Sequence, residues 1–459
     1  MASTNATALR YDSLAMNFPE SHLGPGLLVP NRDLTLPYTE YIRWKDIQPR
    51  IGVVYDLFGN GKTAVKANMS DYVIPQRTSN DYSTMGNPVN ALAQLVPRSW
   101  NDSTYPVGDP RRQNYWPDCD LLNPLANGEC GQLTDLNFGK PIASTQSDPD
   151  MIRGWNKRPK EREYELSVQH QLMPRLGLDL GYFRREFYNF TVVDNRAVGP
   201  QDFSPYSITA PVDPRLPDGG GYVISGLQNL NPDKVGQVNN LFTLARKYGN
   251  QYEHWNGVDF SVNFRPRAGM MIQGGTSTGR TSTDNCEVVR AVPESAGTGA
   301  LPFTSVATAN ASNSPLYCHV DTPFQTQLKL IGSYTVPKVD VLIAATVTSL
   351  PGAAITSNYV ASNAQIQPSL GRPLSGGAAN VTIGLVSPGQ MWGDRINSMD
   401  LRLQKIFRFD NRRLNVGLDI YNALNGSDAV TLNNNYATWL RPQQILLPRF
   451  MKISANLDF

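Results

Sequence analysis

Five pairs of segments in this sequence alternate apolar and polar residues with a period of two, and a tight turn joins the members of each pair. In the clearest pair, Leu166 and Val168 alternate with Glu165 and Ser167 before a turn at 173–175. A period of two places successive side chains on opposite faces of a strand, so each pair predicts a hairpin. The predicted strands are 51–57 with 65–69, 164–172 with 176–182, 258–264 with 270–280, 324–334 with 339–347, and 399–407 with 414–420.

The connections between these strands fall into two classes. The turns within hairpins have about three to five residues, whereas the loops between hairpins have from about twenty to nearly ninety. Strict alternation of short turns and long loops is typical of outer-membrane barrels, where the turns are periplasmic and the loops extracellular. Soluble sandwiches and propellers have no reason to keep it. With a weaker segment at 7–14 and a final strand, the prediction is about twelve strands.

The last nine residues form the final predicted strand. Met451, Ile453, Leu457 and Phe459 alternate with polar residues, and the chain ends on the aromatic ring. This pattern resembles the C-terminal assembly signal of outer-membrane β-barrels, although an edge strand of a water-soluble protein shows the same alternation. The predicted fold class is therefore all-β, an antiparallel transmembrane β-barrel of about twelve strands with long extracellular loops.

Composition agrees with this fold and excludes other classes. No stretch of the 459 residues approaches the roughly 20 apolar residues that a membrane-spanning helix needs. Barrel strands escape that criterion because only alternate residues face lipid. The net charge of +2, without a long basic run, gives no indication of nucleic-acid binding.

The start of the chain and its cysteines bear on the compartment. The first twelve residues lack the charged start and apolar core of a signal peptide, so an exported chain is expected to be a mature form or a fragment. Cys119 and Cys130 lie in one polar segment, and Cys286 and Cys318 in another. Two local disulfides in an oxidising compartment are predicted, with free thiols as the alternative.

The long loops contain the candidate ligand-binding residues. Aromatic and arginine side chains there are suited to stacking on a solute, and packing of the loops together is the alternative role. The candidates are Trp100, Arg111, Arg112, Tyr115, Trp116, Trp155 and Trp439. A short loop helix is also predicted within 235–248, where apolar residues fall at helical spacing.

Several segments taken together resemble one protein family, the TonB-dependent outer-membrane receptors, in the large variants with a carboxypeptidase-regulatory-like domain ahead of the plug. The similarity covers nearly the whole chain. The segments are WKDIQPRIGVVYDLFGNGKT at 44–63, YFRR at 182–185, GVD at 257–259, MDLRLQK at 399–405, DIYNALN at 419–425 and the terminal Phe459. The resemblance implies a 22-stranded barrel with an N-terminal plug, a TonB box that contacts the energy-transducing inner-membrane complex, and active uptake of a scarce solute.

The chain differs from the family pattern because it corresponds to only part of it. It has no recognisable plug, TonB box or regulatory-like domain, so residues 1–459 are interpreted as one barrel region, the C-terminal part of a larger barrel. A barrel piece has two open edges, which hydrocarbon does not tolerate. Either upstream strands complete it, or the chain closes as a smaller barrel. The first case predicts energy-dependent uptake of a siderophore, vitamin, peptide or oligosaccharide, with outer-membrane lipid, the TonB complex and the barrel assembly machinery as partners; the second predicts a passive porin or structural surface barrel.

No segment predicts catalysis, a cofactor or a metal site. Gly274, Gly279 and Arg280 imitate a phosphate loop, but arginine replaces its lysine and strands surround it. The four histidines are far apart in the sequence, and only His319, beside Cys318, hints at a metal. A third possibility, an exported carbohydrate-binding β protein, requires the apolar strand faces to pack on a core rather than on lipid.

Overall fold

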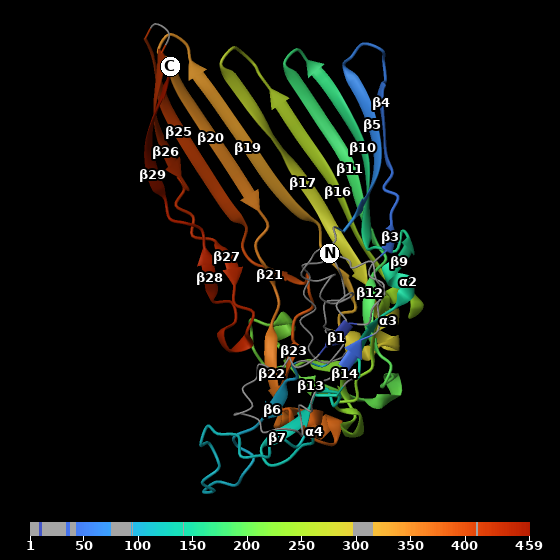
Figure 1. Ribbon diagram of the computed structural model, residues 1–459. Coiled ribbons are helices and arrows are strands. Elements are labelled where there is room, and N and C mark those ends of the chain that lie inside the picture. Colours follow the sequence, from blue (N-terminus) through green and yellow to red (C-terminus); the bar gives the residue numbers. More distant parts are fainter. Residues whose placement is uncertain are drawn as a thin grey trace.

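The computed structural model describes residues 9–11, 34–36, 43–74, 93, 95–140, 142–296, 315–409 and 412–459. It is dominated by one antiparallel sheet of 12 strands, which is long, tilted and curved (Figure 1). Eleven of the strands follow one another across the sheet, and the short β18 (His319–Asp321) pairs with the end of one of them. The eleven are β4 (Arg50–Asp56), β5 (Thr63–Val73), β10 (Lys160–Met173), β11 (Leu176–Tyr188), β16 (Tyr252–Phe264), β17 (Met270–Asp284), β19 (Gln325–Val336), β20 (Val341–Leu350), β25 (Ile396–Phe409), β26 (Arg412–Tyr421) and β29 (Phe450–Asp458).

The five predicted hairpins and the final strand are confirmed, and each of the eleven strands pairs with the next of the eleven along the chain. The predicted strand at 7–14 does not belong to the large sheet. Its described part, β1 (Leu9–Tyr11), pairs with β2 (Leu34–Leu36). The rest of that segment lies outside the described residues. The twelfth strand is β18 instead. The sheet is open, because among the described residues β4 and β29 have no strand on their free sides.

The pairing register places the predicted apolar columns on one face. Leu166 lies opposite Tyr182, Leu403 opposite Leu418, and Leu418 opposite Ile453. We call this the outward face. Its apolar side chains are largely uncovered, as Leu166, Leu403 and Ile453 are each at least half exposed. Single exposed apolar residues are ordinary, but a continuous apolar face across a sheet indicates contact with a partner or with lipid.

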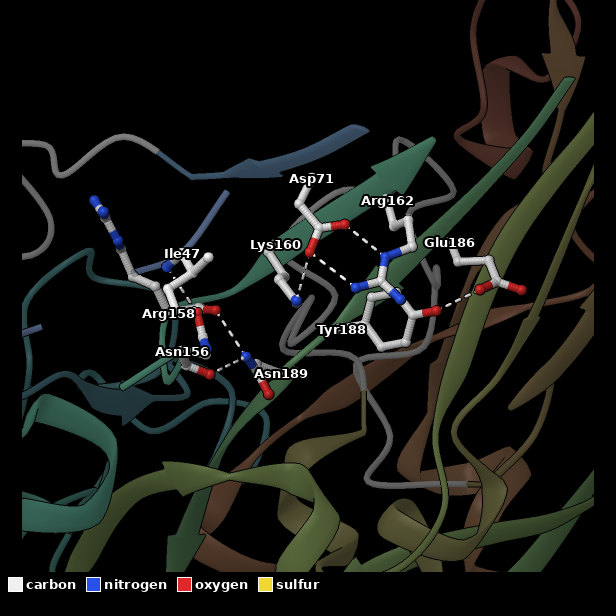
Figure 2. A network of polar contacts seen from close by, with 9 residues as sticks. All are labelled: Ile47, Asp71, Asn156, Arg158, Lys160, Arg162, Glu186, Tyr188 and Asn189. Atoms are coloured by element: carbon white, nitrogen blue, oxygen red, sulfur yellow. Dashed lines mark hydrogen bonds and ion pairs between the residues drawn. The ribbon is translucent and has the colours of Figure 1, made fainter. Parts of the chain in front are cut away.

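Near the loop ends of β5, β10 and β11, a network of charged and polar side chains replaces the apolar residues of the outward face. Figure 2 shows this network. Asp71, almost fully buried, accepts hydrogen bonds from Arg162 Nε at 2.5 Å and from Lys160 Nζ at 2.8 Å. Tyr188, beside them, donates from its hydroxyl to Glu186. The row Asp71, Arg162 and Glu186 is in register across three strands, on the same face as Leu166. The apolar band therefore has a definite end on the loop side.

The loops form a second layer at one end of the sheet, opposite the five turns (Figure 1). Their strands pair in small sheets and their helices are short. The strands are β3 (Arg43–Lys45) with β9 (Arg153–Trp155), β6 (Arg98–Trp100) with β7 (Cys130–Leu133), β12 (Thr191–Asn195) with β15 (Asn240–Leu244) and β8 (Thr145–Ser147), β13 (Phe203–Thr209) with β14 (Val223–Leu230), β21 (Ala354–Ile355) with β24 (Met391–Trp392), β22 (Asn358–Ser362) with β23 (Asn380–Gly384), and β27 (Ala429–Leu432) with β28 (Pro442–Ile445). The helices are α2 (Pro149–Ile152), α3 (Cys286–Ala291) and α4 (Asn363–Leu370), with single 3-10 turns at 200–202, 217–219, 232–234, 245–247, 293–295, 375–377 and 436–438.

The largest buried core of the described chain lies in this loop layer. Leu227, Ile366 and Ile383 are fully enclosed, and they come from two different loops. Burial of a whole aliphatic side chain contributes about 1.5–3 kcal/mol, so the loops have the energetic basis of a folded domain.

The helix predicted within 235–248 is wrong. That segment contains β15 and a single 3-10 turn at Ala245–Lys247. Two strands, β12 and β8, supply the main-chain hydrogen bonds of β15, and Leu244 is buried against Met151 and Ile152. Distant pairing has overridden the local apolar spacing.

None of the helices in the described part of the chain has the length and hydropathy that a membrane span requires.

Candidate ligand-binding surface

One segment of the loop layer contains five of the seven predicted ligand-binding residues. Residues 97–134, which we call the arm, lie farthest from the turns of the sheet (cyan in Figure 1). The strands β6 and β7 pair at its base, with Trp100 opposite Cys130. The disulfide between Cys119 and Cys130 joins the middle of the arm to this base, with the Cα atoms 5.8 Å apart. The first predicted disulfide is confirmed.

The base of the arm is fixed to two other loops. Ser99 Oγ donates a hydrogen bond to the carbonyl oxygen of Gly376 at 2.5 Å, and Gln132 Nε2 donates to the carbonyl oxygen of Val235 at 2.5 Å. Gly131 lies so close to these groups that a Cβ there would come within 2.1 Å of the Gly376 oxygen. A side chain at 131 would therefore separate the arm from the loop that supports it.

A buried carboxylate organises the interior of the arm. Glu129 is 3% exposed, and its Oε2 accepts hydrogen bonds from Trp100 Nε1 at 3.0 Å and from the amide of Asp118 at 3.1 Å. Arg98 donates to the carbonyl oxygens of Gly131 and Leu125 at 2.5 and 2.6 Å, and burial lowers the pKa of this guanidinium. The Trp100 side chain therefore stabilises the arm through its hydrogen bond to Glu129, while its ring stays partly exposed.

The tip of the arm presents two aromatic side chains to solvent. Tyr115 is 86% exposed and Trp116 is 70% exposed. The backbone beneath them is in an unfavourable conformation for residues other than glycine, with φ of 58° at Gln113 and 61° at Tyr115. The Asp102 carboxylate accepts a hydrogen bond from the Tyr115 amide at 2.8 Å, which holds this conformation. Such strain is concentrated at functional sites in proteins, where it sets the orientation of side chains in advance.

The two arginines near the tip of the arm, Arg111 and Arg112, form hydrogen bonds with other residues of the arm. Arg111 donates two hydrogen bonds to Asp109, at 2.8 and 3.0 Å, and its guanidinium lies 3.6 Å from the centre of the Tyr105 ring. The pairing with Arg111 lowers the pKa of Asp109 to about 2, so this carboxylate is ionised at neutral pH. Arg112 donates to the carbonyl oxygens of Ser103 and Tyr105. Arg111 remains about half exposed, so its charge is accessible to a ligand.

The other two predicted residues lie away from the arm. Trp155 is in β9, beside β3, and is 58% exposed, with Lys45 Nζ 5.5 Å from its ring centre. Trp439 is only 2% exposed, in the loop core, and its Nε1 donates to Thr356 at 2.8 Å. The prediction that Trp439 contacts a ligand at the surface is wrong, because its ring packs between loops.

The second predicted disulfide is also confirmed. Cys286 and Cys318 are bonded, with the Cα atoms 4.9 Å apart, which joins α3 to the start of β18. Because Cys318 is in a disulfide, it is not a thiolate ligand beside His319. That histidine bonds to Asp284 and Asp321. Within the described ranges, no group of three or more ligand-type side chains is arranged to hold a metal ion.

The concave face of the sheet, opposite the outward face, contains a polar hollow that sequence reasoning missed. Its volume is about 490 Å³, and Glu163, Arg185, Trp255 and Asp259 are among the residues that line it. Arg185 forms ion pairs with Glu163 and, at 3.8 Å, with Glu161. The Trp255 ring lies over two glycines, Gly257 and Gly279, where an added Cβ would come within 2.2 Å of the ring. In the sequence, the two glycines and Trp255 were the features that could have indicated this hollow.

Comparison with known proteins gives matches to solved structures alone. No family model matches the chain, and no curated protein matches it. Among the similar structures is the ferripyoverdine receptor of the outer membrane of Pseudomonas aeruginosa, at 11% identity and a TM-score of 0.39, covering 89% of this chain and 32% of that one. Another is the outer-membrane transporter YddB from Escherichia coli, at 12% identity and a TM-score of 0.39, covering 88% of this chain and 39% of that one. A third is the FrpB iron transporter from Neisseria meningitidis, at 9% identity and a TM-score of 0.38, covering 89% of this chain and 38% of that one.

The first two of these proteins are named as a receptor and a transporter of the outer membrane, and the third as an iron transporter. Outer-membrane receptors are the class that the sequence resembles. The chain spans about a third of the length of the structures it matches. At this level of identity and TM-score, the matches are a partial likeness of fold and carry no argument about activity or solute.

Proposed function

We propose that this chain is the C-terminal part of the barrel of an outer-membrane receptor that takes up a scarce solute, and that its role is binding and passage rather than catalysis. The observation that carries the proposal is the outward face: apolar columns run across the sheet and stay exposed, while all five turns lie at one end and all long loops at the other. In water such a face would promote aggregation, whereas in a bilayer it is the surface that contacts lipid.

The open sheet favours completion by further strands. Both β4 and β29 carry a free edge in the described structure, and hydrocarbon does not tolerate unpaired main-chain groups. Strands encoded upstream would satisfy both edges. An upstream plug would fill the concave face and would contact the TonB complex, which makes uptake energy-dependent.

The arm is proposed to make the first contact with the solute. Its exposed Tyr115 and Trp116, beside the accessible guanidinium of Arg111, suit a planar or anionic group on a siderophore, vitamin, peptide or oligosaccharide. The final strand is proposed as the element that the barrel assembly machinery recognises, because Met451, Ile453 and Leu457 share the outward face and Phe459 is exposed.

Uptake by the protein encoded by the whole reading frame tests this proposal against a passive porin. Cells that produce it are given iron-55 as a ferric siderophore, cobalt-57 cobalamin and a labelled oligosaccharide, with and without a protonophore. Accumulation of one solute that the protonophore abolishes is expected. Accumulation that survives the protonophore would instead identify a passive pore. A Tyr115→Ala/Trp116→Ala variant is expected to lose most of its affinity for that solute. Tyr252→Ala, at a partly exposed aromatic side chain outside the arm that is not a candidate binding residue, is the control.

A further inference from the structure

The five hairpin turns of the sheet form one continuous edge. Main-chain hydrogen bonds join each hairpin to the next, from Gln171 to Lys62 at 2.7 Å, from Arg265 to Arg175 at 2.9 Å, from Thr335 to Gly269 at 2.8 Å and from Ile406 to Asp340 at 2.9 Å. Ten strands at about 4.8 Å spacing make this edge roughly 45 Å long. All of it lies at the end of the sheet away from the loops (Figure 1).

Cationic side chains are concentrated along this edge. We call six exposed residues the turn rim: Lys62, Arg175, Arg265, Arg267, Lys338 and Arg412. At least one of them comes from each hairpin. The chain as a whole has 41 basic and 39 acidic residues, so the concentration is local and does not follow from composition.

The acidic side chains that the structure describes near the rim bond to groups outside it. Asp458, in register with Arg413 at the end of β29, accepts hydrogen bonds from Asn415 at 3.3 Å and Asn456 at 3.0 Å. Asp340 is the acidic residue of the four described turns, and it pairs with Arg408 outside the rim at 3.2 Å. Asp56, at the end of β4, accepts a hydrogen bond from the amide of Gly61 at 2.7 Å. Asp410, in the fifth turn by sequence, lies outside the described residues. Within the described part of the chain, the side chains of Lys62, Arg265 and Arg412 make no hydrogen bond or ion pair.

Aromatic side chains lie beside the cations. The Arg267 guanidinium is 4.2 Å from the ring centre of Tyr334 on the outward face. Phe58 in the first turn is 66% exposed, and Phe407 and Phe409 stack next to the fifth turn with their ring centres 6.4 Å apart. Aromatic rings at the border of an apolar band, followed by cations, are the arrangement that suits a membrane–water interface.

We propose that the turn rim binds the phosphate groups of anionic phospholipids in the leaflet that the turns face. This inference rests on the proposed function, because it needs the outward face to contact lipid. The exposed cations are separate from one another and follow the border of the apolar face. This extended arrangement suits a layer of lipid headgroups better than one acidic protein, whose contact area would be compact. Each cation near an anionic membrane strengthens binding roughly fivefold.

Vesicle flotation of the full chain tests the inference. The chain, purified in detergent, is diluted into vesicles of phosphatidylcholine or of three parts phosphatidylcholine to one part phosphatidylglycerol. The test variant is Lys62→Gln/Arg265→Gln/Arg412→Gln. The control variant is Lys140→Gln/Arg246→Gln/Arg290→Gln, which removes the same charge from exposed positions in the loop layer.

The wild type and the control are expected to prefer the anionic vesicles, and the test variant is expected to lose that preference by roughly ten- to hundredfold. Binding to neutral vesicles should be equal for all three. Equal binding of the test and control variants to anionic vesicles would overturn the inference, and the rim would then face another partner, such as an acidic protein. Failure of the wild type to bind either vesicle would instead overturn the proposed membrane-spanning sheet.

Two further measurements keep the result interpretable. Heat-modifiable migration on a gel reports whether each variant is folded, and Lys62→Gln alone, with an expected loss of roughly fivefold, replaces the triple variant if that variant does not fold. Sodium phosphate and sodium sulfate at equal ionic strength should weaken binding equally. A specific effect of phosphate would indicate a site for the free ion and would overturn the assignment to headgroups.

Discussion

In the loop layer, Leu227, Ile366 and Ile383 are completely enclosed, whereas in the sheet Leu180, Leu403 and Ile453 are at least half exposed. The same kinds of side chain thus have opposite surroundings within one chain. The loop layer has the burial pattern of a protein that folds in water, with a core and polar networks around it. The sheet has the pattern of a surface that contacts an apolar solvent, with aliphatic side chains exposed along one face. What differs is the solvent that each region requires, not its composition.

The sharpest way to test the core of the loop layer is Ile383→Ala. Removing a fully enclosed aliphatic side chain leaves a cavity, so we expect a loss of about 2–5 kcal/mol in the free energy of unfolding of the loop layer. Denaturant titration in detergent, followed by the fluorescence of tryptophans such as the enclosed Trp439, measures it. Leu403→Ala is the control and should cost less, since no enclosed cavity forms. Equal costs would contradict the distinction between the two regions.

The outward face of the sheet is tested by placing a charge on it. Leu403→Arg is expected to destabilise the protein in lipid vesicles by about 2–4 kcal/mol, because the guanidinium would enter hydrocarbon near the middle of a strand. The neighbouring Gln404 points to the concave face, so Gln404→Arg should change stability by less than about 1 kcal/mol. The two variants introduce the same side chain at adjacent positions of one strand, so they differ in the face of the sheet that receives the charge. If they behave alike, the outward face does not contact lipid.

Removal of the disulfide in the arm should affect the loop layer and leave the sheet intact. For Cys119→Ser/Cys130→Ser we expect a local destabilisation of about 2–4 kcal/mol, since the unfolded arm gains freedom. Limited proteolysis should then cut the arm faster, while the far-UV circular dichroism of the strands stays unchanged. A loss of strand signal would show that the two regions fold as one unit.

The smallest expected effect concerns pH. Asp148, nearly buried in the loop layer, accepts hydrogen bonds from Thr243 Oγ1 and Lys247 Nζ. Burial acts to raise the pKa of this carboxyl, but the bonds from Lys247 and Thr243 outweigh it, and the pKa lies below the usual 3.8. A depressed folded-state pKa contributes stability above the unfolded-state value, and this contribution is lost as the pH falls through the folded-state pKa.

Asp148→Asn should therefore cost about 2 kcal/mol at pH 7 and progressively less below about pH 4. Denaturant titrations of the loop layer across that range measure it. A cost that stays constant with pH would mean that the carboxylate charge makes no contribution. Asp150→Asn, whose side chain is largely exposed, is the matched control.

The sheet could be read from the sequence because its determinants are local. Each strand shows its own alternation, and each turn has its own glycine, proline or asparagine, so all five hairpins were predicted close to their observed limits. Strands such as β10 extend beyond the predicted apolar stretch, to Lys160, because β5 and β11 continue to pair with it there. Residues 160–163 are charged on both faces, so the sequence pattern gave no indication of this extension.

The loop layer could not be read in the same way. The strand β15 forms because β12 and β8 pair with it, Trp439 is buried because loops distant in sequence close over it, and Tyr115 is presented by a backbone conformation held by Asp102. Asp102 is 13 residues from Tyr115, and the partners of β15 and Trp439 are much farther away in sequence, so no local pattern indicates them. The cysteine pairs were an exception, since each lies within one loop segment and leaves few alternatives.

The loop core described above is assembled from three interhairpin loops, which contribute Leu227, Ile383 and Trp439 respectively. Such a core couples the evolution of those loops, because an insertion in one must be accommodated by the other two. The tip of the arm is outside that core and is attached through a base fixed by the disulfide and by Gly131. It can diverge between two fixed ends, so residues 101–118 are a segment whose sequence can change without refolding the rest. Under the proposed role of the arm in solute binding, this is the segment to exchange first when the specificity of the surface is redesigned.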